Sequence, residues 1–139
     1  MKRFVLDASV ALAWFLDRPI APYADHIRHL LLNDNRAVVP ALWQLEMANG
    51  FIVAERRGVL TRSDTVEALQ NLDLVIAQAI ENSLEFVSMR RALHAGREFG
   101  LPAYDAVYLE TAIGQDLPIA TLDRQLKAAA SKAGVEVLS

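Results

Sequence analysis

Four acidic residues stand at positions of the chain where a carboxylate could do chemistry. Asp7 directly follows the apolar run Arg3–Leu6, and Asp123 comes three residues after the apolar run 118–120. Each lies at the start of a predicted helix, where aspartate is a favoured N-cap. Capping and catalysis are therefore both open for Asp7 and Asp123, and one carboxylate oxygen can serve each task.

The other two acids lie on predicted helices with largely apolar faces. Glu46 shares a face of the predicted helix 42–57 with Asn49. A buried carboxylate needs a partner, so Glu46 lies at a polar seam, pairs with an arginine or belongs to a site. Asp105 falls in the first turn of a helix that begins at Pro102, where a negative charge favours the helix dipole. A charge placed only for the dipole would avoid apolar neighbours, yet three follow on its face: Tyr108, Leu109 and Ala112.

A pocket shared by these four acids predicts a metal ion. Carboxylates held close together repel and raise one another's pKa values unless a cation lies between them. The chain has no cysteine, and its histidines (His26, His29 and His94) show no ligand spacing. Ligands made of oxygen alone suit Mg²⁺ or Mn²⁺ rather than Zn²⁺. The chemistry that such a site commonly performs is hydrolysis of a phosphodiester bond.

Short apolar runs alternate with helical patterns along the chain, which predicts a βαβα order, a mostly parallel sheet and the α/β fold class. In such sheets ligands bind beyond the carboxyl ends of the strands, where Asp7 and Asp123 fall. We expect strands at 3–6, 37–39, 118–120 and 135–138, and an ambiguous stretch at 74–77 also fits a short strand. We expect helices at 8–16, 21–33, 42–57, 61–72, 81–99, 102–113 and 124–133, with a capping box at 61–64.

The length and composition favour a single domain over residues 1–139. Of the 139 residues, 53% are hydrophobic, which is enough to fill a core and too many for a disordered protein. The absence of cysteine excludes a disulfide scaffold and a thiolate metal site. No apolar segment approaches the ~18 residues of a membrane span, and charge interrupts the N-terminal run before it could form a signal peptide. We therefore expect a soluble, cytoplasmic protein.

The net charge of −3 argues against a protein that binds nucleic acid through bulk positive charge. Leaving out the four acids changes this net charge from −3 to +1, so a modest basic surface elsewhere stays open. The alternative for most of the arginines is an ordinary solvated surface. The arginines available to contact phosphates are Arg56, Arg57, Arg90, Arg91, Arg97 and Arg124.

The predicted helix 42–57 is apolar almost all round, more than packing against one sheet face requires. We expect its core face to carry Ala41, Leu45, Ala48 and Ile52. Five large side chains either contribute to an exposed patch that binds a partner or are buried under the following helix: Trp14, Phe15, Trp43, Met47 and Phe51.

Four short segments carry the acids. They are Val5-Leu6-Asp7-Ala8-Ser9, Leu45-Glu46-Met47-Ala48-Asn49, Tyr104-Asp105-Ala106-Val107-Tyr108-Leu109 and Ala120-Thr121-Leu122-Asp123. In their order and spacing these segments resemble the PIN-domain ribonucleases, and most closely the VapC-type toxins of toxin–antitoxin pairs. The resemblance covers essentially the whole chain. It implies a PIN-like three-layer α/β/α sandwich with a mostly parallel central sheet.

The resemblance also implies a role for each matching residue. Asp7, Glu46 and Asp105 would hold Mg²⁺ or Mn²⁺, with Asp123 as a more variable fourth acid. Three polar residues would orient the acids or water: Ser9, Asn49 and Thr121. The implied activity is endonucleolytic cleavage of single-stranded or looped segments of structured RNAs, often transfer or ribosomal RNA, by the toxin of a type II toxin–antitoxin system. The implied partners are a second copy of the chain, in a homodimer, and a cognate antitoxin that occupies the active-site groove.

Two other functions stay open from the sequence. A non-catalytic PIN-like module would bind RNA or protein without cleaving it, although the retention of all four acids argues against this. A receiver-type phosphoacceptor domain would use Asp7 near the sheet edge. The chain lacks the paired acids after the first strand and the late strand-end lysine that such chemistry uses.

Overall fold

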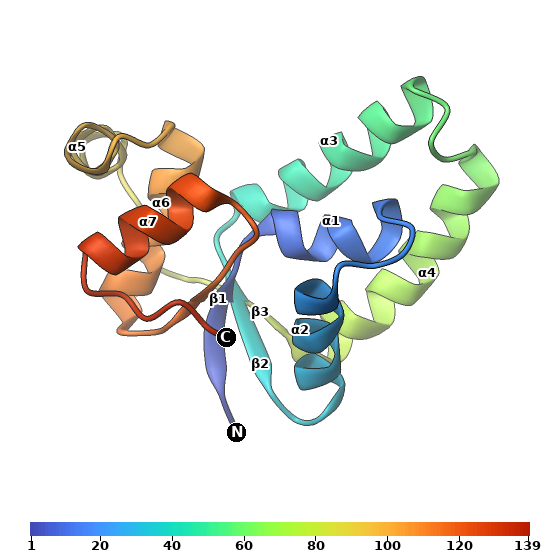
Figure 1. Ribbon diagram of the computed structural model, residues 1–139, viewed down its shortest axis with the longest axis horizontal. Coiled ribbons are helices and arrows are strands. Elements are labelled where there is room, and N and C mark those ends of the chain that lie inside the picture. Colours follow the sequence, from blue (N-terminus) through green and yellow to red (C-terminus); the bar gives the residue numbers. More distant parts are fainter.

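A four-stranded sheet runs through the middle of the protein, and all of its strands are parallel (Figure 1). The structure is a computed structural model that describes all of residues 1–139. The strands are β1 (Arg3–Leu6), β2 (Arg36–Val39), β3 (Ile80–Asn82) and β4 (Ile119–Ala120), in the spatial order β3-β2-β1-β4. The parallel sheet confirms the α/β fold class predicted from the sequence.

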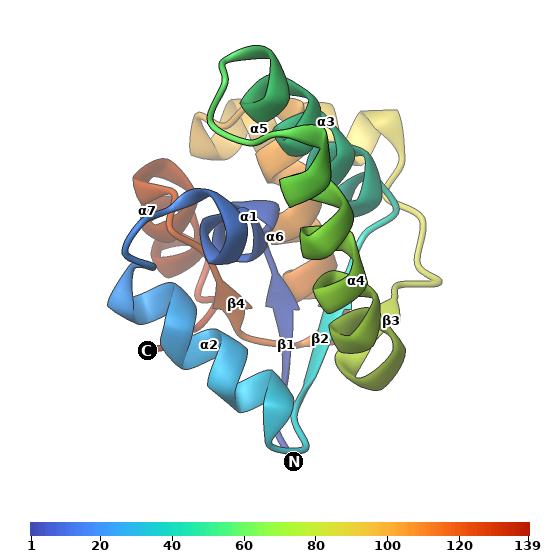
Figure 2. The same cartoon turned by 90° about the vertical axis from the view of Figure 1, so that its right-hand side faces the viewer.

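Seven helices surround the sheet. They are α1 (Ala8–Leu16), α2 (Pro22–Leu32), α3 (Leu42–Arg56), α4 (Arg62–Ala79), α5 (Met89–Phe99), α6 (Ala103–Gln115) and α7 (Arg124–Lys132). Helices α1, α2 and α4 lie on one side of the sheet and α5, α6 and α7 on the other (Figure 1). Helix α3 lies across the end toward which β1 and β2 point (Figure 2). These layers confirm the α/β/α sandwich.

The order of the strands reverses beside β1. From β1 the chain steps outward to β2 and β3 on one side, and it later returns to β4 on the other side. Such a switch leaves a crevice beyond the carboxyl ends of the two central strands. Asp7 follows β1 and Thr121 follows β4 at this crevice, and the backbone N–H of Asp7 donates to the carbonyl oxygen of Ala120 at 3.0 Å. The fold therefore brings the residues after these two strands side by side.

Strand β1 is buried on both faces, as expected for the centre of a parallel sheet. Its residues Phe4, Val5 and Leu6 are fully buried in a core cluster of 35 residues. Covering on both faces explains why a continuous apolar run precedes Asp7 in the sequence. None of the helices combines the length and the apolar character that crossing a bilayer requires.

Helix α4 is longer than predicted. It begins at the predicted capping box, in which Thr61 and Asp64 exchange hydrogen bonds between side chain and backbone. It then continues to Ala79, so the stretch 74–77 is helical and not a strand. The buried residues that extend the helix recur at helical spacing: Ala68, Leu72, Val75 and Ala79.

The predicted helix 81–99 is wrong in its first half. Residues 80–82 form β3 at the edge of the sheet, paired with β2. The helix begins only at Met89, because the Ser88 hydroxyl caps it by accepting a hydrogen bond from the backbone N–H of Arg91 at 3.2 Å. A three-residue strand that forms only by pairing with its neighbour leaves little signal in its own sequence.

The strand predicted at 135–138 is reduced to a single bridge between Val137 and Ile119 of β4. Two backbone hydrogen bonds flank it: the N–H of Ile119 donates to the carbonyl of Glu136, and the N–H of Leu138 donates to the carbonyl of Ile119. The C-terminal segment is thus anchored beside β4 without forming a full strand. The remaining predicted elements agree with the structure to within two residues at each end.

Helix α3 packs through a different face from the one predicted. Its buried residues are Trp43, Met47, Phe51 and Ala54, whereas the predicted core face is exposed at Ala41, Leu45, Ala48 and Ile52. The five large side chains whose exposure was open (Trp14, Phe15, Trp43, Met47 and Phe51) are buried, except Phe15, which is partly buried. Two apolar faces of one helix compete for the same neighbours, and the sequence does not say which face those neighbours cover.

Candidate active site

The four acids singled out in the sequence line one open pocket of about 660 Å³. Asp7 comes from the end of β1, Glu46 from α3, Asp105 from the first turn of α6 and Asp123 from the residue before α7. The pocket lies at the crevice where the strand order reverses. The fold therefore gathers carboxylates that are far apart in the sequence.

Asp7 is the most enclosed of the four acids, with 5% of its surface exposed. Its Oδ2 accepts hydrogen bonds from the hydroxyls of Ser9 and Thr121, both at 2.7 Å. The Ser9 hydroxyl oxygen accepts from the backbone N–H of Leu122 at 3.1 Å, and that of Thr121 accepts from the N–H of Asp123 at 3.0 Å. Both hydroxyls bind the same carboxylate oxygen, so Oδ1 of Asp7 is left available to a ligand.

Glu46 is oriented by Tyr108, a residue that the sequence analysis missed as part of the site. The Tyr108 hydroxyl donates to Oε1 of Glu46 at 2.5 Å, which ties α6 to α3. Burial, followed by the hydrogen bond and charge of Glu46, raises the pKa of Tyr108 far above its ordinary value, so the hydroxyl keeps its proton. The arginine partner considered for Glu46 is absent. The signal for Tyr108 in the sequence is its position one turn after Asp105.

Asp123 both caps a helix and lines the pocket. Its Oδ1 accepts a hydrogen bond from the backbone N–H of Leu126 at 3.1 Å, at the start of α7. Asp7 occupies the corresponding position before α1 but makes no side-chain cap. Capping and a place in the site therefore coexist at Asp123, whereas the Asp7 carboxylate is held by the hydroxyls of the site.

The polar residues predicted to support the acids are also near the pocket. Asn49 lines it on the face of α3 that carries Glu46, and Ser9 lines it beside Asp7. Thr121 is buried beneath the pocket and reaches it through Asp7. Asn49 makes no side-chain hydrogen bond within the protein, so its polar group is available to a ligand.

No basic side chain lines this pocket. The six ion pairs of the protein all lie elsewhere, and none includes one of the four acids. Enclosed acids that serve structure alone are normally paired with a cation. The four acids lie together without one, which leaves the pocket able to accept a positively charged ligand.

Burial and mutual repulsion raise the pKa of three of the acids. Burial is the largest cause at Asp7 and at Glu46, and the hydrogen bonds from neighbouring hydroxyls offset part of it. At Asp105 burial comes first and the charges of the other three acids follow, and together they raise its pKa to about 6. The neutral forms are favoured because nothing in the protein compensates the negative charge.

The donor set fits a hard divalent cation. The acids offer oxygen ligands only, as Mg²⁺ and Mn²⁺ prefer, and a cation among them would relieve the repulsion described above. No three of the side chains form a closed metal cage as they stand, so ion binding requires the carboxylates of this open pocket to draw closer together.

A second cavity, of about 510 Å³, lies between α1, the α1–α2 connection, α2 and α4. Its charged residues have both signs, with Arg18 and Arg28 beside Asp64 and Glu67. Charges that compensate one another in this way do not form an acid cluster. The chemistry predicted from the sequence therefore belongs to the pocket at the strand ends.

The sequence matches the PIN domain family over residues 4–132, a range that includes all four acids. Among solved structures, the protein is similar to the crystal structure of PAE2754 from Pyrobaculum aerophilum, with a TM-score of 0.66 and 25% sequence identity. That similarity covers 92% of this chain and 84% of the other. A search of curated proteins finds no match.

The raised pKa of Asp105 predicts that the metal-free protein loses stability as the pH rises. The folded chain holds the Asp105 proton more tightly than the unfolded chain. Its contribution to stability is therefore fully present below the unfolded value of 3.8 and is lost as the pH rises through about 6. In EDTA, the free energy of unfolding of the wild type should fall between about pH 4 and about pH 7 relative to that of Asp105→Asn.

Urea denaturation at a series of pH values measures this difference. Asp73→Asn removes an exposed acid of α4 outside the pocket, so its profile should follow that of the wild type. Parallel profiles for the wild type and Asp105→Asn would show that the site does not perturb this carboxyl.

Thr121→Val should weaken both folding and metal binding. The substitution removes a buried hydroxyl that donates to Asp7, and loss of a hydrogen bond to a charged group costs about 1.5–3 kcal/mol. Mn²⁺ affinity, measured by calorimetry, should fall ~10–100-fold because Asp7 is no longer oriented. Thr111→Val is a matched control, since that buried hydroxyl bonds only to the carbonyl of Val107 within α6. Equal Mn²⁺ affinities for the two variants would contradict the role of Thr121.

Proposed function

The chain belongs to the PIN domain family, and we propose that it is a metal-dependent endoribonuclease that hydrolyses phosphodiester bonds in RNA. PIN domains are generally nucleases, and they typically use divalent metal ions. The observation that carries the proposal is the pocket itself, in which four carboxylates meet without a basic side chain. The family match disfavours the receiver-type alternative.

Asp7, Glu46 and Asp105 would hold Mg²⁺ or Mn²⁺, with Asp123 as the fourth acid. When bound, the ion supplies Lewis-acid chemistry that favours attack of water on the phosphorus and stabilises the charge that develops on the phosphate. Hydroxyl groups of the protein donate to Asp7 and Glu46, whereas no side chain donates to Asp105.

The protein's own contribution is to hold these acids in place before the substrate arrives. The hydroxyls of Ser9 and Thr121 fix one oxygen of Asp7, and the hydroxyl of Tyr108 fixes one oxygen of the α3 carboxylate. No histidine or lysine lines the pocket. A proton released by the attacking water would therefore pass to a carboxylate, Asp105 or Asp123.

We extend the proposal to the biological role that the resemblance to VapC-type toxins implies. The chain would be the toxin of a type II toxin–antitoxin system, with a structured RNA such as transfer or ribosomal RNA as its target. A cognate antitoxin would silence it by occupying the acid pocket. This role needs a pocket that is open to a macromolecule, and the acid pocket is open to solvent.

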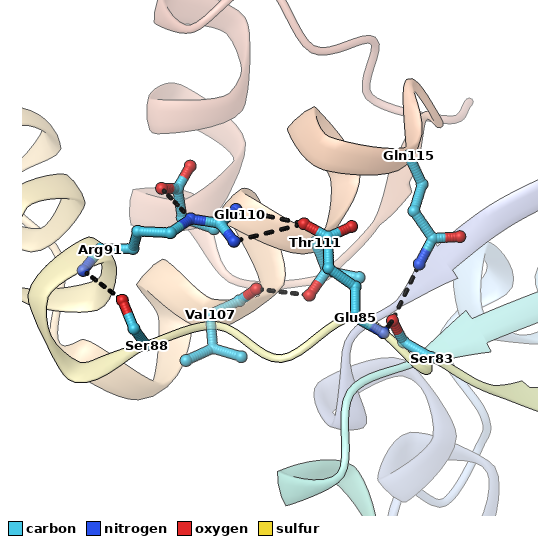
Figure 3. A network of polar contacts seen from close by, with 8 residues as sticks. All are labelled: Ser83, Glu85, Ser88, Arg91, Val107, Glu110, Thr111 and Gln115. Carbon is cyan, nitrogen blue, oxygen red and sulfur yellow. Dashed lines mark hydrogen bonds and ion pairs between the residues drawn. The ribbon is translucent and has the colours of Figure 1, made fainter.

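A homodimer is the other assembly that the resemblance implies, and the segment before α5 supports it. Leu84 is 100% exposed and Phe86 is 83% exposed. Between them Glu85 points the other way, to Arg91 of α5, which also pairs with Glu110 of α6 (Figure 3). The network holds the segment against two helices, so its apolar side chains are presented on an ordered surface.

Removal of the acids should abolish RNA cleavage. With Mg²⁺ or Mn²⁺ the wild type should cleave RNA, and Asp7→Asn or Asp105→Asn should lower the rate ~100-fold or more, because each removes a charge that the ion requires. EDTA should stop cleavage by the wild type. Gel analysis of end-labelled RNA measures these rates, and expression in bacterial cells should arrest growth with the wild type only.

Asp73→Asn is the control, since it removes one negative charge far from the pocket and should cleave as the wild type does. Cleavage that survives both EDTA and the two substitutions would refute the mechanism. RNA that stays intact but remains bound would favour the non-catalytic RNA-binding module instead.

The homodimer predicts that a second copy covers the segment before α5. Phe86→Ala should shift the wild-type dimer toward monomer, because it removes a large apolar side chain from the centre of the contact. Analytical ultracentrifugation measures the shift, and Val59→Ala, another exposed apolar position, serves as the control. A wild type that sediments as a monomer at high concentration would contradict the proposal.

A further inference from the structure

Two large apolar side chains stand at the mouth of the acid pocket, each directly before one of the acids in the sequence. Leu45 precedes Glu46 on α3, and Tyr104 precedes Asp105 on α6. Leu45 is 74% exposed and Tyr104 is 67% exposed, yet both line the pocket together with the acids. The acids are less exposed than either of them. The exposed lining residues of the pocket are therefore Leu45, Tyr104 and the polar Asn49, and the acids are more enclosed.

Tyr104 has no structural task that explains an aromatic residue at this place. Its hydroxyl makes no hydrogen bond within the protein, and its ring belongs neither to the core cluster nor to an aromatic pair. It lies one turn before Tyr108, whose hydroxyl fixes the α3 carboxylate, so it continues that face of α6 out toward solvent. It is the one aromatic side chain among the residues that line the pocket.

The pocket itself offers no positive side chain to an RNA. The chain has a net charge of −3, no basic side chain lines the pocket, and unpaired arginines such as Arg124, directly after Asp123, lie outside its lining. Arg91, one of the arginines available in the sequence to contact phosphates, is held between Glu85 at 3.3 Å and Glu110 at 3.5 Å (Figure 3). Stacking of bases on aromatic rings is the source of affinity that needs no protein cation and tolerates any base.

We propose that Tyr104 is a stacking platform for an unpaired nucleobase of the RNA, beside the phosphodiester at the four acids, with Leu45 as an apolar wall on the α3 side. The inference rests on the proposed nuclease function, for which the family resemblance already implies unpaired RNA, and it adds the residue that contacts the unpaired base. A base within a duplex is covered on both faces by its neighbours and cannot reach a protein ring without leaving the stack. Tyr104 thus selects the substrate and takes no part in the chemical step.

A nucleobase explains the ring better than a protein partner does. Leu45 shares an exposed apolar face of α3 with Ala41, Ala48 and Ile52, whereas Tyr104 lies on another helix, α6, directly before Asp105. A protein contact would be expected on a broader apolar surface, such as that face of α3 or the segment that carries Leu84 and Phe86. The position of Tyr104 therefore favours contact with the nucleotide whose phosphate enters the pocket.

Steady-state cleavage of an unstructured RNA with Mn²⁺ tests the platform. Tyr104→Ala and Tyr104→Leu should raise KM about 10-fold or more and leave kcat within about threefold, because the ring contributes binding alone. Tyr104→Phe is the matched control and should stay within about twofold of the wild type, since the ring and not the hydroxyl makes the contact. Thermal midpoints should be unchanged in all three, because the residue is exposed.

A fluorescence titration that needs no cleavage separates this inference from the nuclease function. The probe is a short single-stranded RNA with one 2-aminopurine flanked by uridines, titrated with each protein in Ca²⁺ instead of Mn²⁺. Stacking should quench the probe with the wild type and Tyr104→Phe, but not with Tyr104→Ala or Tyr104→Leu. Annealing a complementary strand should abolish the quenching by the wild type.

The outcomes are distinguishable. Tyr104-dependent quenching without RNA cleavage would support the platform and refute the nuclease. Cleavage with unchanged KM and quenching in Tyr104→Ala would overturn the platform and leave the nuclease intact. Loss of self-association in Tyr104→Ala, with RNA affinity unchanged, would assign the ring to a protein contact and also overturn the proposal.

Discussion

The gathering of four acids without a compensating cation is the constraint on which the rest of this structure depends. Burial and the charges of the other three acids raise the pKa of Asp105 to about 6, and no basic side chain in the pocket opposes this. In the metal-free protein the packing of the core has to offset the cost of enclosing these groups. The elements that carry the acids are accordingly well anchored, with β1 fully buried at Phe4, Val5 and Leu6, and α6 fully buried at Tyr108 and Leu109.

The topology explains why such an arrangement forms only in the complete fold. Each acid arrives on a different element, and the reversal of strand order beside β1 is what brings the end of β1 next to the end of β4. The hydroxyls of Ser9 and Thr121 then bind the same oxygen of Asp7 from these two segments. One carboxylate oxygen is thus used to join the strand ends, and the other is left for a ligand. The Asp7 side chain therefore both stabilises the fold and belongs to the site.

The sequence allowed the prediction of those parts of the site that follow from local rules. Acids that follow buried strands, such as Asp7 and Asp123, must meet at one edge of a parallel sheet, and the structure places them there. The hydrogen bond from Tyr108 to Glu46 could not be predicted from the sequence, because it depends on how α3 packs against α6. The buried face of α3 was mistaken for the same reason, since Leu45 and Met47 are both apolar and only Met47 reaches the core. Strand β3 likewise exists only through its pairing with β2.

Charged side chains are arranged differently in the segment before α5 and in the acid pocket. Arg91 serves two glutamates, Glu85 and Glu110, and so fixes the segment before α5 against α6 instead of meeting phosphate. The acid pocket in turn receives no arginine, which keeps its carboxylates free for a cation. With no basic side chain in the pocket, salt-dependent contacts to phosphate would have to come from arginines outside its lining, such as Arg124 directly after Asp123. Within the pocket itself the available sources of RNA affinity are a bound cation and uncharged contacts, and the exposed ring of Tyr104 is placed to make such a contact.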